Sequence, residues 1–177
     1  LSGARNTGLK YVNGDCIYFY DPDDLLDKNC LINLTQLFNS DIDIIIGKSA
    51  QVYDQTTNVI DTLEHYNVTE KPITNKNFIE FSLKNPLNVV AWNKLYNTQF
   101  VFANELRFKD GIVHEDELWF FQTMSVARTI VFNSEITYYY NIGNQTSITK
   151  NYSLYNLKSY LTVIENIFSD HYVPEKN

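Results

Sequence analysis

Residues 15–26 read Asp-Cys-Ile-Tyr-Phe-Tyr-Asp-Pro-Asp-Asp-Leu-Leu, and this stretch decides the fold. Residues 16–20 are apolar, rich in β-forming side chains and too few for a helix, so they predict a buried strand. Asp21, Asp23 and Asp24 follow at its carboxyl end, where open α/β sheets bind their ligands. Close carboxylates repel one another unless a cation neutralises them, and they suit Mg²⁺ or Mn²⁺ beside a substrate diphosphate. The hypothesis is a metal-diphosphate site; the alternative is a turn in which Asp24 caps a following helix.

The composition suits one globular domain. The chain has 177 residues, of which 44% are hydrophobic and 20% charged, enough to bury a sizeable core. Its net charge of −7, without a clustered basic stretch, argues against nucleic acid as a partner. The two cysteines, Cys16 and Cys30, make neither a disulfide framework nor a zinc site, which indicates a reducing compartment. No apolar run approaches the length that a membrane span requires.

Apolar periodicity predicts helices and strands that alternate along the chain, as in an α/β fold. Ser2 is expected to cap the first helix and Asn13-Gly14 to stop it in a left-handed turn. The expected helices cover residues 3–12, 25–38, 75–84, 98–104, 118–127 and 154–168. The expected strands cover residues 16–20, 41–46, 88–91, 129–132 and 136–141, with residues 51–53 as a weaker strand candidate in the poorly patterned stretch 49–74.

A second acidic group, His114-Glu115-Asp116-Glu117, opens the expected helix 118–127. One interpretation is structural, because negative charges in the first turn of a helix complement the helix dipole. The other interpretation is catalytic. Transfer from a phosphorylated donor needs a cation for the leaving diphosphate and a separate carboxylate that accepts the proton of the attacking hydroxyl.

Several motifs occur in one order along the chain. They are Ser2-Gly3-Ala4-Arg5-Asn6-Thr7-Gly8-Leu9, Gly14-Asp15 with Asp21-Pro22-Asp23-Asp24, Trp92-Asn93-Lys94-Leu95-Tyr96, His114-Glu115-Asp116-Glu117, and Tyr138-Tyr139-Tyr140 with Ser147-Ile148. With them the chain resembles the family 2 glycosyltransferases of GT-A fold, particularly the bacterial enzymes that build capsular and surface polysaccharides. The resemblance implies an α/β fold with a mixed sheet flanked by helices. It also implies that residues 1–177 form a single domain, the C-terminal metal- and acceptor-binding part of a GT-A catalytic domain, without the N-terminal nucleotide-binding half.

The resemblance also implies roles for single residues at the matched positions. Asp21 and Asp23 match the family's Asp-x-Asp motif, although Pro22 stands where the family more often has Ser or Ala and stiffens the turn. On the donor side, Asp23 would contact the metal directly, and Asp21 would contact the donor's ribose or the metal's water shell. Asp24 would be a further carboxylate of the metal site, and Arg5 would approach the diphosphate. On the acceptor side, Asp116 would be the general base, and Glu115 would orient this base or contact the acceptor. Trp92 would stack on a sugar and Lys94 would contact a phosphate. His114 would lie beside the base. A core Trp92, a solvated Lys94 and a structural His114 are the alternatives.

The function that the resemblance implies is metal-dependent, inverting transfer of a sugar to a hydroxyl of a glycan or lipid-linked glycan. The donor is a nucleotide-sugar, with a UDP-sugar favoured, and the cofactor is Mn²⁺ or Mg²⁺. The expected location is the cytoplasm. Alternatively, the full-length protein is expected to associate peripherally with the inner face of the cell membrane. Two other functions stay open: a phosphotransferase of the haloacid-dehalogenase type with Asp21 as nucleophile, and a non-catalytic glycan-binding remnant.

Overall fold

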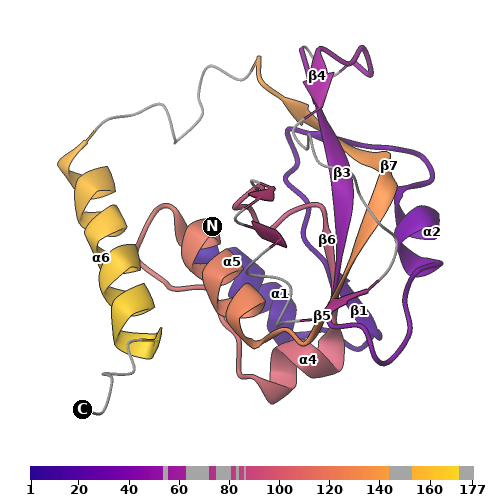
Figure 1. The fold of residues 1–177 in the computed structure, drawn as a ribbon. Helices are drawn as coiled ribbons and strands as arrows, with labels where there is room; N and C mark the ends of the chain where they lie inside the picture. The colour runs from indigo at the N-terminus through magenta and orange to yellow at the C-terminus, as the bar shows by residue number, and fades with distance from the viewer. Residues whose placement is uncertain are drawn as a thin grey trace.

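A computed structural model describes residues 1–53, 56–62, 72–74, 81–82, 84–85, 87–143 and 153–171 (Figure 1). The helices are α1 (Ser2–Lys10), α2 (Cys30–Thr35), α4 (Thr98–Ala103), α5 (Glu115–Val126) and α6 (Leu154–His171). The strands are β1 (Cys16–Tyr18), β2 (Leu25–Leu26), β3 (Ile44–Val52), β4 (Asp61–Thr62), β5 (Ile73–Thr74), β6 (Lys94–Asn97) and β7 (Thr129–Asn141). Among the described residues, no helix combines the length and the apolar character that a bilayer crossing requires.

The strands form one mixed sheet in the order β1-β6-β3-β7-β2, with β4 paired to β3 and β5 paired to β7. β3 and β7 run parallel through the centre, and the other pairs are antiparallel. Helices cover both faces of this sheet, α2 on one and α1, α4 and α5 on the other (Figure 1). The expected α/β class with a mixed sheet flanked by helices is therefore confirmed.

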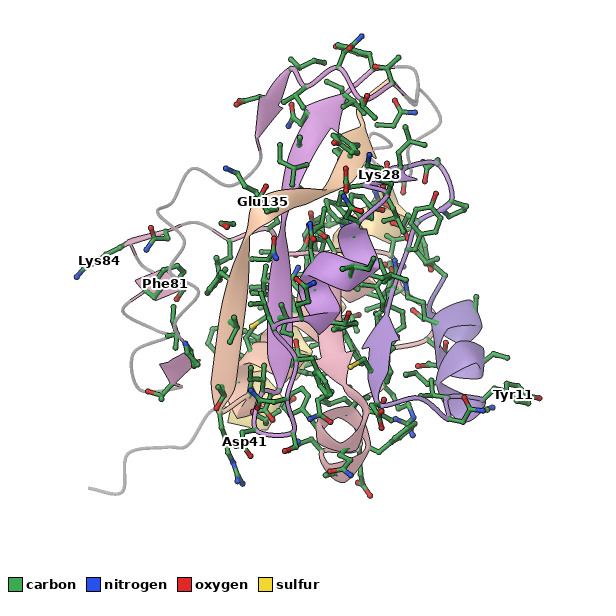
Figure 2. All side chains as sticks on the ribbon, turned by 90° about the vertical axis from the view of Figure 1, so that its right-hand side faces the viewer. Tyr11, Lys28, Asp41, Phe81, Lys84 and Glu135 are labelled. Carbon is green, nitrogen blue, oxygen red and sulfur yellow. The ribbon has the colours of Figure 1, made fainter. Side chains whose placement is uncertain are left out.

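The central strand β3 is buried on both faces. Its side chains alternate, so Ile44 and Ile46 join the larger cluster under α1, α4 and α5, while Ile45 joins the smaller cluster under α2. Trp119 of α5 is fully buried in the larger cluster. Figure 2 shows Tyr11, at the end of α1, projecting away from the body on the side opposite Lys84. The sheet thus fixes α1 and α5 on the same face.

Helix α6 lies beside α5, away from the sheet (Figure 1). It contacts the loop 111–114 that leads into α5. The Tyr155 hydroxyl donates to the Gly111 carbonyl at 3.1 Å, and the Ser159 hydroxyl accepts from the Val113 N–H at 3.2 Å. The ring of Tyr160 stacks on the ring of His114 with 3.9 Å between centroids. α6 therefore fixes the backbone just before Glu115.

The expected helix over residues 25–38 is wrong in its first part. Leu25–Leu26 form β2 beside Tyr138 and Tyr139, and the helix covers only Cys30–Thr35, with Asn29 rather than Asp24 at its N-cap. The cause is Asp24, whose carboxylate binds the Tyr138 hydroxyl and so holds the following residues extended along β7. The expected strand 16–20 is shorter than predicted and ends at Tyr18, at the edge of the sheet.

Other differences also follow from long-range contacts. Residues 88–91 are not a strand, because Lys94 Nζ binds the carbonyls of Asn88 and Val90 and curls this segment. The Ser2 hydroxyl donates to the Lys109 carbonyl instead of capping α1, and α1 ends at Lys10 without the expected left-handed stop. β3 continues through Gly47 to Val52, and the two strands expected within 129–141 are one strand, β7.

The remaining expectations agree with the structure where it describes them. The helices expected at 98–104, 118–127 and 154–168 are confirmed as α4, α5 and α6. Phe81 is helical within the expected helix 75–84, and its ring packs on that of Phe132 of β7 with 4.9 Å between centroids. Residues 75–80, and the expected closing motif at Ser147-Ile148, lie outside the described residues.

Candidate active site

Arg5 joins the two acidic groups that the sequence places 90 residues or more apart. It projects from α1, with its side chain only 7% exposed. Nη2 donates to Asp21 Oδ1 at 3.0 Å, and Nη1 donates to Glu115 Oε1 at 3.3 Å and to Asp116 Oδ1. A planar guanidinium presents donors in several fixed directions, so one side chain can bind carboxylates from two segments. The expected donor side and the expected acceptor side therefore meet at one arginine.

The charges of this cluster do not balance. Burial alone would lower the pKa of Arg5, but Asp116 and Asp21 outweigh it, so the pKa is raised and the guanidinium stays charged. Burial raises the pKa of Asp21, with Arg5 opposing and Asp116 and Asp23 adding to the rise. Burial likewise raises the pKa of Glu115. One guanidinium thus leaves several carboxylates undercompensated, which suits the binding of a cation.

Residues 21–24, here called the aspartate loop, carry the expected metal ligands. Asp21 is partly buried against Arg5, whereas Asp23 is exposed. Within the part of the chain that the structure describes, no group of three His, Cys, Asp or Glu side chains is arranged so that it could hold a metal ion by itself. Mg²⁺ and Mn²⁺ commonly take only one or two protein carboxylates and fill the other positions with water and substrate phosphates. The oxygen donors of Asp21 and Asp23 fit such an ion.

Asp24 has a different position from its neighbours. It is 3% exposed, and both of its carboxylate oxygens accept hydrogen bonds, Oδ2 from the Tyr138 hydroxyl at 2.6 Å and Oδ1 from the Asn141 N–H at 2.8 Å. The Asp21 N–H also donates to the Tyr138 oxygen, at 3.4 Å. Asp24 and Tyr138 therefore anchor the aspartate loop to β7. The metal contact expected for Asp24 would compete with these two bonds.

Trp92 packs against Tyr138, the residue that binds Asp24. Its ring is 5% exposed and stacks on Tyr138, with 4.4 Å between centroids and 12° between planes, and on Tyr140 at 5.5 Å and 15°. The preceding residue, Ala91, donates its N–H to Asp116 Oδ2 at 3.3 Å. Residues 87–93, here called the Trp92 loop, thus connect the expected base to the aspartate loop. The stacking of Trp92 on a sugar stays a prediction.

Lys94 is neither solvated nor extended toward the aspartate loop. Its ammonium group is buried and donates to the Asn88 carbonyl at 3.2 Å and to the Val90 carbonyl at 2.6 Å. It also lies 5.4 Å from the centroid of the Phe120 ring. The solvated alternative is therefore wrong, and in the structure Lys94 shapes the Trp92 loop.

His114 immediately precedes the two acidic residues and adopts the left-handed region, with φ of 65°. Its ring stacks on Tyr160, and its Nδ1 lies 3.6 Å from Glu117 Oε1. Its buried Nε2 has no hydrogen-bond partner among the residues that the structure describes. These contacts favour a positioning role, in which His114 fixes the start of α5 and hence the Asp116 backbone.

Sequence reasoning named Tyr138 and Asn93 only as parts of motifs and gave neither a role. Tyr138 anchors Asp24, and the Asn93 side chain accepts from the Thr137 hydroxyl at 2.7 Å. For Tyr138 the available signal was a tyrosine within a predicted strand, since the hydroxyl of a buried tyrosine usually finds a hydrogen-bond partner.

Comparison with known families and curated proteins gives consistent matches. Residues 1–101 match the sequence model described as glycosyl transferase family 2. The chain is 24% identical over 168 residues to "Putative glycosyltransferase EpsH" of Bacillus subtilis, covering 93% of this chain and 48% of that protein. It is 26% identical over 165 residues to the processive diacylglycerol beta-glycosyltransferase of Mycoplasma pneumoniae, covering 85% and 46%. The chain spans about half the length of these curated relatives.

Solved structures of S. aureus TarS have the same fold. The crystal structure of TarS 1–349 with UDP-GlcNAc superposes with a TM-score of 0.74 at 18% identity, covering 96% of this chain and 46% of that one. The structure with UDP gives 0.66, also at 18% identity, covering 98% and 46%. At this identity the likeness concerns the fold alone.

Proposed function

The chain belongs to the family 2 glycosyltransferases and has a GT-A fold, and from this premise we propose that the cluster around Arg5 is the catalytic centre of a sugar transfer from a nucleotide-sugar. The observation that carries the proposal is the bridge that Arg5 makes between Asp21 and Asp116. It brings the matched Asp-x-Asp motif and the matched base position into one site. Residues 1–177 would then form one domain, the metal- and acceptor-binding part of a longer catalytic domain.

The donor side consists of Asp21, Asp23 and Arg5. Asp23 and Asp21 would hold Mn²⁺ or Mg²⁺, and this ion, when bound, supplies charge stabilisation to the leaving diphosphate. Arg5 lies between this side and the base and can donate to a phosphate oxygen in place of one carboxylate, because its fork suits either partner. Asp24 and Tyr138 keep the aspartate loop in place while the donor binds.

The acceptor side is organised by Asp116. Arg5 binds one of its oxygens and the Ala91 N–H binds the other, so the carboxylate plane is fixed. Each carboxylate oxygen has two lone pairs, which leaves capacity to accept the proton of an acceptor hydroxyl. A hydroxyl activated in this way displaces the nucleotide in one step with inversion at the sugar carbon. Glu115, held by the same guanidinium, orients Arg5.

The relatives support the proposed substrate classes. The TarS structures hold UDP and UDP-GlcNAc, which supports a UDP-sugar as donor. A glycan or lipid-linked glycan is the proposed acceptor, and the diacylglycerol named for the Mycoplasma relative supports a lipid-linked one. The proposed location is the cytoplasm, at the inner face of the cell membrane for the full-length protein.

The phosphotransferase alternative is not kept. The GT-A fold and the family match leave no role for Asp21 as a nucleophile of the haloacid-dehalogenase type. A glycan-binding remnant differs from a transferase in one respect, since its saccharide binding would be indifferent to metal.

The test is an NMR titration of isotope-labelled protein with Mn²⁺ and UDP, read as paramagnetic broadening at each residue. We expect broadening centred on residues 21–24 that reaches Asp116, is lost in Asp23→Ala and is kept in Asp41→Ala, an exposed aspartate at the start of the segment leading into β3. Diffuse broadening that is equal in both variants would overturn the proposed donor site.

A further inference from the structure

Helix α6 carries its large apolar side chains on the face that points away from the rest of the protein. The side chains that it buries are small, since Ser159 and Val163 are each 2% exposed. By helical geometry the opposite face consists of residues that are at least 47% exposed, here called the α6 seam: Leu154, Leu157, Leu161, Ile164 and Phe168. A surface helix normally turns such side chains toward the core, and a contiguous exposed apolar patch marks an interaction site. The α6 seam is therefore expected to have a partner.

The spacing of the α6 seam is that of a coiled coil. Its members follow one another at intervals of three, four, three and four residues, as the a and d positions of heptads do. They form one narrow stripe along roughly 20 Å of helix. A helix that packs on a core carries a wider stripe, which includes e or g positions. Figure 1 shows α5 on one side of α6 and no other described helix or strand on its far side. The α6 seam therefore fits a second helix with the same spacing.

The charges that flank the α6 seam are complementary to one another. Residues 154–169 contain two charged side chains, Lys158 and Glu165, on either side of Leu161 along the helix. Each directly follows a d residue of the seam, so both occupy e positions on the same edge of the stripe. In an antiparallel pair of two α6 helices with a two-fold axis near Leu161, Lys158 of each copy lies opposite Glu165 of the other. A parallel pair would instead set like charges level with each other.

An anionic lipid surface fits the α6 seam less well than a second helix does. Helices that lie in a membrane interface typically carry a polar face rich in Lys and Arg. Residues 154–169 contain one basic and one acidic side chain, and the whole chain has a net charge of −7. Negative charge on both sides would oppose binding to anionic lipids, whereas a pair of α6 helices gains two ion pairs at its edge.

We propose that the α6 seam binds the α6 seam of a second copy of this chain, in an antiparallel pair with two-fold symmetry. The pair removes the apolar stripe of both copies from water, and Lys158 and Glu165 set its orientation. The opposite side of α6 keeps its contacts with the loop 111–114, so association leaves the backbone before Glu115 in place. The inference does not rest on the proposed sugar transfer, because it predicts a dimer with or without a donor.

The experiment is sedimentation equilibrium of the 177-residue chain at physiological salt. Because the seam is short for a specific interface, we expect a reversible dimer with a Kd of about 1–100 μM. Leu161→Glu should raise this Kd at least about tenfold, since it places a charge in the apolar stripe. Leu31→Glu makes the same change at a leucine of α2 that is 52% exposed, against 50% for Leu161, and should keep the wild-type Kd. A wild type that stays monomeric throughout this range, or equal weakening by both variants, overturns the proposal.

A pair of charge reversals tests the antiparallel orientation. Lys158→Glu alone sets carboxylates opposite carboxylates in the dimer, and Glu165→Lys alone sets ammonium groups opposite ammonium groups. Each variant should therefore dimerise more weakly than the wild type. An equimolar mixture of the two variants should associate more tightly than either alone, because every carboxylate on this edge of the mixed pair again faces an ammonium group. A mixture that associates no better than the separate variants overturns the antiparallel arrangement.

Vesicle flotation tests the lipid alternative directly. The probes are phosphatidylcholine vesicles with and without phosphatidylglycerol. We expect the wild type to stay unbound to both kinds of vesicle while it sediments as a dimer. A wild type that sediments as a monomer and floats with vesicles, and that no longer floats as Leu161→Glu, overturns the proposal and assigns the α6 seam to a membrane surface.

Discussion

Arg5 Nη2 lies 3.0 Å from Asp21 Oδ1, and the same guanidinium binds Glu115 and Asp116. This relationship makes α1 part of the proposed catalytic centre as well as part of the core. It also makes the centre depend on one positive charge, since burial raises the pKa of Asp21 and of Glu115 while Arg5 opposes it.

Arg5→Ala should destabilise the protein by about 3 kcal/mol, because it leaves buried carboxylates without their partner. Arg5→Lys keeps the charge but not the fork, so a smaller loss of about 1–2 kcal/mol is expected. Urea denaturation followed by tryptophan fluorescence measures both values. Equal stability of the wild type and the two variants would show that the bridge contributes nothing to folding.

Asp116→Asn should lower the turnover of the full-length enzyme by at least about 100-fold, since an amide cannot accept the hydroxyl proton. Donor affinity should change little, because the donor contacts proposed here belong to Asp21, Asp23 and Arg5. Initial rates and donor titration test the two statements separately. Asp110→Asn, an exposed position in the loop before α5, is the matched control and should keep wild-type rates. Parallel loss of turnover and donor affinity in Asp116→Asn would argue against the base assignment.

The spacing of apolar residues within a segment was enough to predict those helices and strands whose buried face is set by that spacing. The acidic start and apolar body of α5, and the apolar run Ile44–Ile46 in β3, are examples. It failed at Leu25 and Leu26, which have helical spacing relative to Cys30 and Leu34. Their conformation is set by the bond between Asp24 and Tyr138, residues 114 positions apart, and no periodicity carries that information.

The same limit applies to the site. The acidic residues were recognisable as types at motif positions, but their connection through Arg5 and the Trp92 loop is a property of the folded chain. Lys94 shows the difference. A lysine in a motif suggests a phosphate contact, whereas the carbonyls of Asn88 and Val90 that it binds come close only when the loop curls.

The buried carboxyl group of Asp24 should make the free energy of unfolding depend on pH. Burial raises its pKa above the ordinary value of 3.8, so the folded state binds the proton more tightly than the unfolded state. Its contribution to stability is therefore complete below pH 3.8 and is lost as the pH rises through the folded pKa. The difference in unfolding free energy between wild type and Asp24→Asn should then shrink as the pH is raised from about 3.5 to 7. Urea denaturation at several pH values measures it, and a difference that grows with pH would show that the hydrogen bonds from Tyr138 and Asn141 outweigh burial and lower the pKa of this carboxyl.

The stacking of Tyr160 on His114 should couple α6 to the start of α5. Tyr160→Ala removes the stack on His114 and should cost about 0.5–1.5 kcal/mol, with chemical-shift changes at His114 and Glu115. Tyr160→Phe keeps the ring and should leave these resonances in place. Leu161→Ala, at the next and more exposed position of α6, is the control. Identical spectra for Tyr160→Ala and Leu161→Ala would mean that the stack does not position the loop.

Gly47 and Gly8 form a matched pair for testing how closely the sheet packs on Asn93. A Cβ at Gly47 would lie 2.2 Å from Thr137 Oγ1 and 2.4 Å from Asn93 Oδ1, whereas one at Gly8 in α1 would meet nothing within 4 Å. Gly47→Ala should therefore destabilise the protein by about 1–3 kcal/mol through overpacking. Gly8→Ala should stabilise it by up to about 1 kcal/mol, because alanine is the better helix former. Thermal denaturation of the two variants gives opposite signs if the packing is as described. A neutral Gly47→Ala would mean that Asn93 and Thr137 move aside to make room for the added methyl group.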